Sequence, residues 1–408
     1  MTSATPLTRT FWHGRADAAE LARWTDVAER VAAELAVDVV ARDRANALPV
    51  APLELLRASG LADLLVPAEL GGHGAHWETA FAVARILARV DASIAQILGY
   101  SWLNQACVVF YGTDAETTAR WLARSAAAHW VWSDSFNPVS PDLSLAWDGE
   151  RYLLNGRKAF ATGAAVADVV IAGAVAGGGA FNGQLVVFAL DARRDGVRHL
   201  GDWDNIGYRA SASGGVEYAD VAVTADDVIG VDRDEPFSAV VTPGVQLLFG
   251  NVYLGIAQGA LAQARELTRA RRNSWFLSGV DRYADDPVVH RVFGDLVART
   301  AAVEALADRL DRDFDDTVAL GHDITADDRT AIELSVAALK IVATDTALEV
   351  SARVFEATGA SSTRTATGLD LHWRNIRTHS LHDPVDYKRI EVGAHYLNGT
   401  VQPVSLYT

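Results

Sequence analysis

The stretch Gly156-Arg-Lys-Ala-Phe-Ala-Thr-Gly163 lies inside a segment whose composition and hydrophobic pattern differ from those of the sequence on either side. Between residues 130 and 231, short apolar or alternating runs are separated by glycine, aspartate and asparagine, which is the pattern of strands joined by turns. Tight turns are expected at Asp148-Gly149 and Asn155-Gly156, and a loop at Gly177-Gly-Gly179. We therefore expect a small β domain with strands within 130–136, 151–154, 169–175, 185–190, 215–218 and 221–223.

Helical sequence lies on both sides of this β segment. Alanine, leucine, glutamate and arginine dominate residues 17–130, and Asp114 is expected to cap a helix over 115–125. Three later ranges, 244–272, 287–313 and 325–357, are long and alanine-rich, as in a helix bundle. The acidic runs 311–316 and 323–328 are expected to be solvated. The residues predict an α+β multidomain chain: a helical domain at 1–129, a β domain at 130–235 and a helical bundle at 236–408.

The bulk composition limits the partners and the compartment. The chain has 408 residues and a formal net charge of −16, which disfavours nucleic acids and anionic membrane surfaces as partners. Local basic clusters would have to hold any anionic cofactor. The single cysteine, Cys107, lies in an apolar run and is expected in the core, so we expect neither a disulfide framework nor a thiolate metal site. No targeting signal or membrane span is evident, so we expect a cytoplasmic protein.

Histidines gather near the end of the chain. Four of the eleven lie within residues 372–395, together with Arg374 and Arg377. His379 and His382 are three residues apart, so they share a face if the segment is helical. A packed core does not need this mixture, whereas a site that handles protons and anions does.

Several common sites are missing from the sequence. It contains no G-x-G-x-x-G fingerprint after a first strand, no Walker loop and no G-x-S-x-G elbow, so we expect no nicotinamide-binding domain. The pairs His73/His76 and His379/His382 could each offer two metal ligands, but no third ligand stands at a convincing spacing. We therefore expect no metal.

The order of helices, β domain and helices resembles the acyl-CoA dehydrogenase fold. Gly156-Arg-Lys-Ala-Phe-Ala-Thr-Gly163 looks like a conserved segment of its middle domain, and Gly207-Tyr-Arg-Ala-Ser-Ala-Ser-Gly214 looks like its G-x-R-x-S signature. The resemblance extends over nearly the whole chain. It implies an N-terminal helical domain, a central β-barrel or sandwich domain and a C-terminal four-helix bundle.

The end of the chain narrows this resemblance. Trp373-Arg-Asn-Ile-Arg-Thr-His-Ser-Leu-His-Asp-Pro-Val-Asp-Tyr-Lys388 resembles the flavin-dependent monooxygenases (group D) built on this fold, typified by the dibenzothiophene monooxygenases. Thr268-Arg-Ala-Arg-Arg-Asn-Ser-Trp275 and Ala95-Gln-Ile-Leu-Gly-Tyr100 match the same group. Three positions depart from its pattern, where a histidine, an asparagine and an arginine are replaced by Gln96, Asp134 and Asn273.

The resemblance implies a two-component monooxygenase that is a homotetramer. Reduced FMN, or alternatively FAD, comes from a separate NAD(P)H-dependent flavin reductase and reacts with O2 to give a C4a-hydroperoxide. This species oxygenates a small organic substrate at sulfur, nitrogen or an aromatic ring. One alternative is an acyl-CoA dehydrogenase-like flavin enzyme, although residues 244–251 lack the glutamate that such an enzyme uses as base. Another is a non-catalytic flavin-fold binding protein.

The resemblance also indicates candidate site residues. His379, His382 and Tyr100 are the candidate catalytic residues, because their side chains can exchange protons. The candidate flavin contacts are polar groups for the ring and arginines for the phosphate: Asp134, Asn137, Thr162, Gly163, Arg269, Arg271, Arg272, Arg374 and Arg377. The candidate substrate pocket is Gln96, Tyr100, Trp132 and Trp203. The alternative is structural in each case: histidines that cap helices or pair with Asp383, turn residues, solvated arginines and aromatic core residues.

Overall fold

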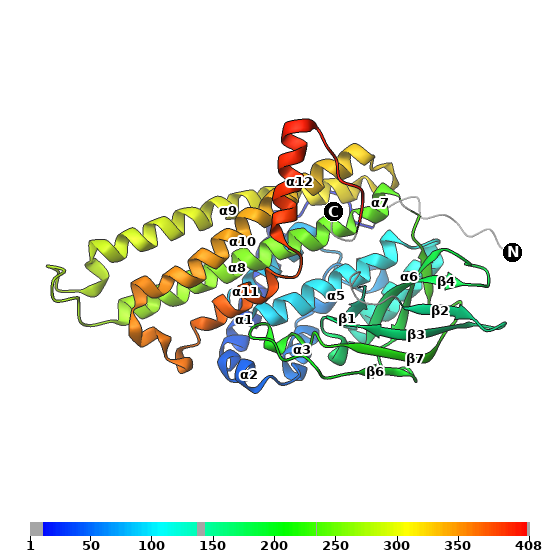
Figure 1. Ribbon diagram of the computed structural model, residues 1–408, viewed down its shortest axis with the longest axis horizontal. Coiled ribbons are helices and arrows are strands. Elements are labelled where there is room, and N and C mark those ends of the chain that lie inside the picture. The colour runs from blue at the N-terminus through cyan, green and yellow to red at the C-terminus, as the bar shows by residue number, and fades with distance from the viewer. Residues whose placement is uncertain (1–10, 137–142, 234, 406–408) are drawn as a thin grey trace.

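A computed structural model describes residues 11–136, 143–233 and 235–405 of the chain. The N-terminal helices are α1 (Ala18–Ala36), α2 (Val39–Ala45), α3 (Val50–Ala58), α4 (Trp77–Ala88), α5 (Ala92–Phe110) and α6 (Ala115–Ala128). Asp114 caps α6 as predicted, since its carboxylate accepts the Thr117 backbone N–H at 2.7 Å. Figure 1 shows these helices lying against the long C-terminal helices, with the strands gathered at one end.

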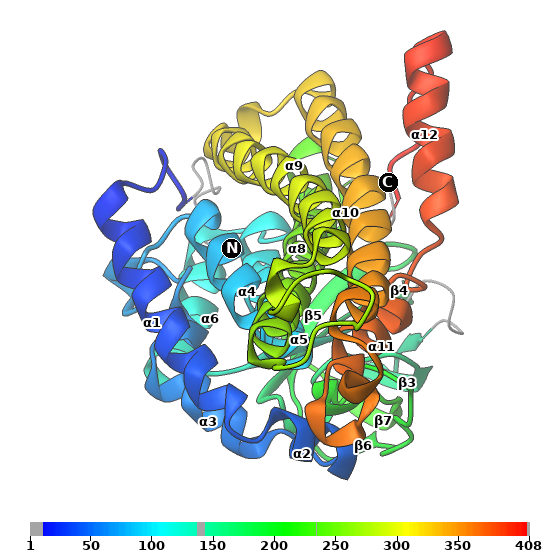
Figure 2. The same ribbon diagram turned by 90° about the vertical axis from the view of Figure 1, so that its left-hand side faces the viewer.

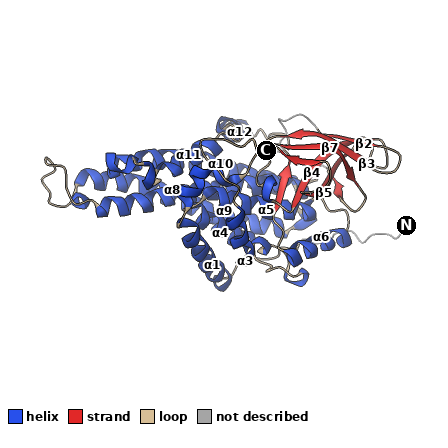
Figure 3. Cartoon of the chain, turned by 90° about the horizontal axis from the view of Figure 1, so that it is seen from below, coloured by secondary structure: helices blue, strands red, loops and turns tan. Residues whose placement is uncertain are grey.

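The strands form one curled sheet. They are β1 (Trp132–Ser135), β2 (Ser144–Trp147), β3 (Tyr152–Lys158), β4 (Val169–Gly177), β5 (Leu185–Asp191), β6 (Val197–His199), β7 (Val216–Val223) and β8 (Val228–Val231). Their order is β6-β7-β3-β2-β4-β5-β8, with β1 parallel to β4. The sheet has a hydrophobic core of its own, which includes Leu154, Phe188 and Val221. Figure 3 shows the strands segregated from the helices, as the α+β prediction requires.

The turns of the β region are partly as predicted. Asp148-Gly149 joins β2 to β3, and Gly177-Gly-Gly179 begins the loop between β4 and β5. The predicted turn at Asn155-Gly156 is wrong, because both residues lie within β3. The pairing of β3 with β7 shifts in register between Leu154 and Gly156, so the Asn-Gly pair marks a bulge. The sequence also did not reveal β2, β6 and β8, which have only three or four residues each.

The C-terminal region is a bundle around one buried helix. Its members are α7 (Pro236–Ala239), α8 (Val241–Ala270), α9 (Pro287–Ala319), α10 (Ala326–Thr358), α11 (Asp370–His379) and α12 (Val385–Asn398). Figure 2 shows α8, α9 and α10 stacked side by side, with α12 along the outside of α10. The stretch Pro236–Ala270 is long and apolar enough to cross a membrane, but 89% of its most apolar window is buried within the protein. It is therefore accounted for as the central helix of the bundle.

The prediction that the acidic run 311–316 is solvated holds for Asp313 and Asp316, which are 41% and 50% exposed, and is wrong for Asp311 and Asp315. Asp311 and Asp315 are both buried between α9 and α4. Asp311 accepts a hydrogen bond from the Arg85 guanidinium at 2.8 Å, and Asp315 accepts the backbone N–H of Trp77 at 2.8 Å. Through these hydrogen bonds the two carboxylates link α9 of the bundle to the N-terminal helix α4.

Helix α5 fixes the position of the functional site. Every residue of α5 is buried, because it lies between α4, α8 and β1. Its first turn is capped by Asp91, whose carboxylate accepts the backbone N–H groups of Ser93 and Ile94. The polar side chains on this helix must therefore find buried partners or face a cavity.

Candidate active site

A cavity of about 720 Å³ lies where α5, β1, the start of α8 and the segment after α11 meet. Its α5 wall is made by Gln96, Tyr100, Asn104 and Cys107. These residues are separated by four, four and three positions, so they share one face of the helix. Sequence reasoning missed Asn104, although this spacing from Gln96 and Tyr100 could have found it. Cys107 is buried as predicted, and burial raises the pKa of its thiol.

The remaining walls are mainly apolar and aromatic. They include Phe136, Phe160, Trp203, Ile206, Tyr208, Val241, Val245 and Leu381. Phe160 has a positive φ of 61°, a backbone conformation that costs energy for a bulky residue, and its ring packs edge-on against Trp203. The acidic side chains among the described lining residues are Asp134 and Asp204, and no glutamate occurs among them. The described lining thus lacks the glutamate that a dehydrogenase uses as its base.

His379 is held as a neutral ring. The Gln96 amide donates to its Nε2 at 3.0 Å, and the Tyr253 hydroxyl donates to its backbone carbonyl at 3.2 Å. The same hydroxyl lies 2.8 Å from Nδ1 of His379, so Nδ1 carries the proton and donates it. Burial lowers the pKa of His379 well below its usual value, and the neighbouring His382 and Lys340 add to this effect. Both ring nitrogens are therefore engaged, and the ring forms part of a fixed wall.

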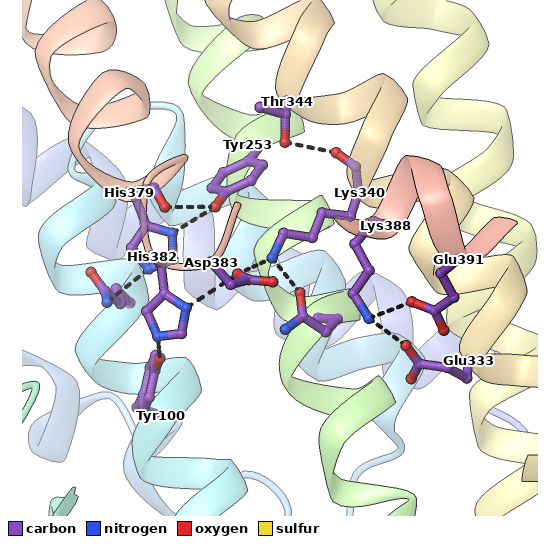
Figure 4. Close-up of polar contacts among 12 residues, drawn as sticks. Tyr100, Tyr253, Glu333, Lys340, Thr344, His379, His382, Asp383, Lys388 and Glu391 are labelled. Atoms are coloured by element: carbon purple, nitrogen blue, oxygen red, sulfur yellow. Dashed lines mark hydrogen bonds and ion pairs between the residues drawn. The ribbon is translucent and has the colours of Figure 1, made fainter. Parts of the chain in front are cut away.

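His382 is placed differently, between the cavity and a buried ion pair (Figure 4). Its Nε2 lies 3.4 Å from the hydroxyl of Tyr100, and its Nδ1 lies 3.2 Å from Oδ1 of Asp383. The Asp383 carboxylate also accepts a hydrogen bond from Lys340 on α10. Burial alone would raise the pKa of Asp383, but the hydrogen bond with His382 and the charge of Lys340 outweigh it and lower that pKa. His382 and Tyr100 therefore form a pair at the cavity wall that can hold and pass a proton.

Thr162 presents a hydroxyl to the cavity. Its Oγ1 accepts hydrogen bonds from Ser213 Oγ at 3.2 Å and Gln96 Nε2 at 3.4 Å. Its backbone carbonyl accepts from Ser133 Oγ at 2.6 Å, which fixes the loop after β3. Since the oxygen already accepts two hydrogen bonds, its own proton is left for a ligand in the cavity.

Asp134 is a buried carboxyl group on the opposite wall. The Asn104 amide donates to its Oδ2 at 3.2 Å. Burial raises the pKa of Asp134, and the hydrogen bonds from Asn104 and the Phe136 backbone only partly offset this effect. The cavity is therefore a poor place for a second negative charge.

Of the other predicted site residues that the structure describes, Trp132, Gly163, Arg269, Arg271, Arg272 and Arg374 do not line this cavity, whereas Arg377 does. The prediction for Trp132 is wrong: its indole is fully buried and donates to Ser125 Oγ at 2.9 Å, because α6 covers that part of β1. The guanidinium of Arg374 pairs with Asp43 and Asp370, so it is committed to holding α11 in place. Gly163 follows Thr162 in the left-handed region, with φ of 74°. Asn137 lies outside the described residues.

Arg269, Arg271 and Arg272 lie at the far end of α8. Arg271 lines a second cavity of about 200 Å³ together with Thr358, Ser361 and Ser362. Its guanidinium stacks 3.9 Å from the ring centre of Tyr283. This group of an arginine and three hydroxyls has the chemistry of a phosphate site.

The histidine pairs show no metal site. His76 Nδ1 bonds to Glu20 at 2.7 Å, which raises the pKa of His76 to about 9, and His73 packs against Trp24. Within the described ranges, no group of three or more His, Cys, Asp and Glu side chains could hold a metal ion.

The cavity fits a flavin ring. Its size is in the range of cofactor pockets. Among the described residues, several of its buried polar atoms have no hydrogen-bond partner: Gln96 Oε1, Tyr208 OH, Thr378 Oγ1 and Arg377 Nε. Such atoms are costly unless a ligand or water satisfies them, and the edge of an isoalloxazine ring carries both donors and acceptors.

Comparison with protein families accounts for almost the entire chain. Residues 19–129 match the acyl-CoA dehydrogenase N-terminal domain, residues 138–221 the middle domain and residues 247–387 the C-terminal domain. These matches agree with the helix, sheet and bundle order of the structure.

The most informative similarities are to individual monooxygenases, which indicate the branch of the family to which the chain belongs. The chain is 34% identical to the probable FMNH2-dependent monooxygenase SfnC of Pseudomonas putida, over 94% of this chain and 96% of that protein. It is 36% identical to the dibenzothiophene monooxygenase of Mycolicibacterium goodii, over 91% and 93% of the two chains. The FMN-bound structure of TdsC from Paenibacillus sp. A11-2 superposes with a TM-score of 0.91 at 32% identity, covering 95% of this chain and 100% of TdsC. The chain therefore belongs to the acyl-CoA dehydrogenase family and is an FMN-dependent monooxygenase within it.

Proposed function

We propose that this monooxygenase is the oxygenase of a two-component system and oxidises the sulfur atom of an uncharged aromatic compound. A separate flavin reductase supplies the reduced FMN. The name of the relative from Mycolicibacterium goodii supports sulfur chemistry, because dibenzothiophene is an aromatic thioether. The observation that carries the proposal is the cavity wall, where aromatic and aliphatic side chains surround one buried carboxyl group.

The Asp134 part of the cavity wall disfavours anionic substrates, although the Arg377 side chain also lines the cavity. Phe136, Phe160 and Trp203 offer faces and edges on which a flat ring can pack. A small anion such as a sulfinate would have to share the cavity with the carboxyl group of Asp134, whose raised pKa already reflects the cost of a charge there. An apolar aromatic substrate avoids that cost.

The side chains of the cavity have separate roles in the proposed reaction. Bound FMN, once reduced, supplies the ring that activates O2 for transfer of one oxygen atom to the substrate. The Thr162 hydroxyl would help to hold the bound ring by donating a hydrogen bond to its polar edge. Tyr100 and His382 hold a proton at the cavity wall and exchange it between the hydroxyl and Nε2. Phe160 and Trp203 at the mouth limit the entry of water.

We propose that Arg271 serves the cofactor of a neighbouring subunit in a homotetramer. Val245 at the start of α8 lines the large cavity, whereas Arg271 follows the last residue of the same helix. A rise of about 1.5 Å per residue puts roughly 40 Å between them, too far for one FMN molecule to reach both. The exposed side chains of Trp275, Phe276 and Leu277 next to Arg271 supply an apolar surface for subunit contact.

The substrate proposal is tested with the purified chain, FMN, NADH, O2 and an unrelated flavin reductase. We expect dibenzothiophene to be converted to its sulfoxide and methanesulfinate to be left unchanged. Conversion of methanesulfinate to methanesulfonate without any dibenzothiophene sulfoxide would contradict the substrate class. Product formation from NADH without the reductase would contradict the two-component arrangement. A monomer in light scattering would contradict the tetramer.

A further inference from the structure

Lys340 is a buried lysine that the chemistry of the cavity does not explain. It lies in the middle of α10 and is fully buried. Its ammonium group donates to Gln246 Oε1 at 2.6 Å and to Asp383, and it lies 5.4 Å from the ring centre of Phe249. Burial lowers its pKa to about 8, although Asp383 acts in the opposite direction. Keeping a lysine in such a place is costly, which calls for a function.

We propose that Lys340 and Asp383 are positioning residues that fix the proton of His382 on Nδ1 and direct its Nε2 toward Tyr100. The inference rests on the proposed role of His382 and Tyr100 and extends it to two residues outside the cavity. Figure 4 shows the resulting line of side chains from α10 through the segment after α11 to α5.

The direction of each hydrogen bond supports this assignment. An ionised carboxylate can only accept, so a hydrogen bond between Asp383 Oδ1 and His382 Nδ1 requires the proton to be on Nδ1. The lone pair of Nε2 then faces the Tyr100 hydroxyl at 3.4 Å. When a proton passes from that hydroxyl to Nε2, the ring becomes an imidazolium that Asp383 stabilises. The return of the proton restores the neutral ring.

Lys340 keeps Asp383 in the ionised form. A buried carboxyl group without a cation would take up a proton at neutral pH and would cease to be a pure acceptor. The other groups that face His382 cannot replace Lys340. His379 stacks on the ring as a neutral imidazole at 5.4 Å, Phe249 contributes only an aromatic edge at 5.1 Å, and the carboxyl group of Asp134 carries no positive charge in either protonation state.

The chain offers a matched control in Lys388. This second lysine lies on α12, is also buried, and pairs with Glu333 on α10 and Glu391 on α12. If Lys340 had only a structural role, Lys340→Met and Lys388→Met would leave His382 in the same tautomer. If Lys340 positions His382, only Lys340→Met changes the tautomer of His382.

The test is the tautomer of His382 in the FMN-free chain, read from the ring ¹⁵N and N–H resonances and assigned with His382→Gln. We expect Nδ1–H in the unmodified protein, in Lys340→Arg and in Lys388→Met. We expect its loss in Lys340→Met and in the isosteric Asp383→Asn, which carries the test if Lys340→Met does not fold. Nε2–H in the unmodified protein, or the same tautomer in all variants, would overturn the proposal.

Kinetics separate this proposal from the proposed function. With dibenzothiophene as substrate, Asp383→Asn should lower kcat by about 100-fold or more, the lower range of general acid–base effects, while KM and FMN affinity change by less than about twofold. Full kcat in Asp383→Asn would overturn the positioning role. Full kcat in His382→Gln would instead refute the proposed role of His382 and leave the tautomer result standing.

Discussion

The substitution Lys388→Met should destabilise the protein far more than Arg389→Met at the next position. Lys388 Nζ donates to Glu333 Oε1 at 2.6 Å and Glu391 Oε2 at 3.1 Å. The exposed fractions of these three residues are only 2%, 2% and 4%. Arg389 also bridges α12 to α10 through Asp345, but its side chain is 41% exposed and that of Asp345 is 57% exposed.

The expected magnitudes follow from burial. Without Lys388, two buried carboxylates would lose their shared hydrogen-bond donor and keep Arg329, which lies 3.8 Å from Glu333. Breaking a buried ion pair from one side costs about 3–5 kcal/mol, because the remaining charge is uncompensated. An exposed pair is worth about 1 kcal/mol or less. Since Glu333 and Glu391 raise the pKa of Lys388 against the effect of burial, the lysine's contribution is fully present at neutral pH and is lost only in alkali.

The assay is urea unfolding at neutral pH followed by circular dichroism, with the free energy of unfolding obtained by linear extrapolation. Replacing all three buried residues by apolar ones of similar size should recover much of the loss, because no buried charge then remains. A Lys388→Met variant within about 1 kcal/mol of Arg389→Met would refute the reasoning from burial.

Three further outcomes are expected. Tyr100→Phe should lower kcat about 100-fold without changing FMN affinity, measured by steady-state kinetics and flavin fluorescence, because it removes the proton that faces His382. Asp134→Asn should become increasingly more stable than the unmodified protein in thermal unfolding as the pH rises above about 4, the ordinary pKa of an aspartate. Burial raises the pKa of Asp134 in the folded protein, so the unmodified protein loses stability as the pH rises from the ordinary value to the raised one, and a neutral amide removes this loss. Arg271→Met should weaken FMN binding about tenfold in fluorescence titrations, and unchanged affinity would count against a phosphate site at that position.

Local features, which depend only on residues close together in the chain, could be predicted from the sequence. Asp114 caps α6, as the sequence predicts. The Asp148-Gly149 turn between β2 and β3 could also be predicted, because the geometry of a tight turn depends on only four consecutive residues. The resemblance supplied the fold order and the flavin chemistry, since its motifs recur in sequence order.

Contacts between distant residues could not be predicted in this way. The run of aspartates at 311–316 has the composition of a solvated surface, and only the fold brings Arg85 to Asp311 from 226 residues away. Trp132 and Asp134 point to the same side of β1, but α6 covers the first and leaves the second facing the cavity. The pairing of Lys340 with Asp383 likewise joins residues from two separate segments of the chain.

The most direct test of the central claim is oxygen labelling under ¹⁸O2. The chain, FMN, an unrelated NADH-dependent flavin reductase and dibenzothiophene are combined, and the product is analysed by mass spectrometry. We expect dibenzothiophene sulfoxide that carries one ¹⁸O atom from O2, and we expect this product to be lost in His382→Gln. Absence of any oxygenated product, or oxygen derived from water, would contradict reduced-flavin monooxygenation in this cavity.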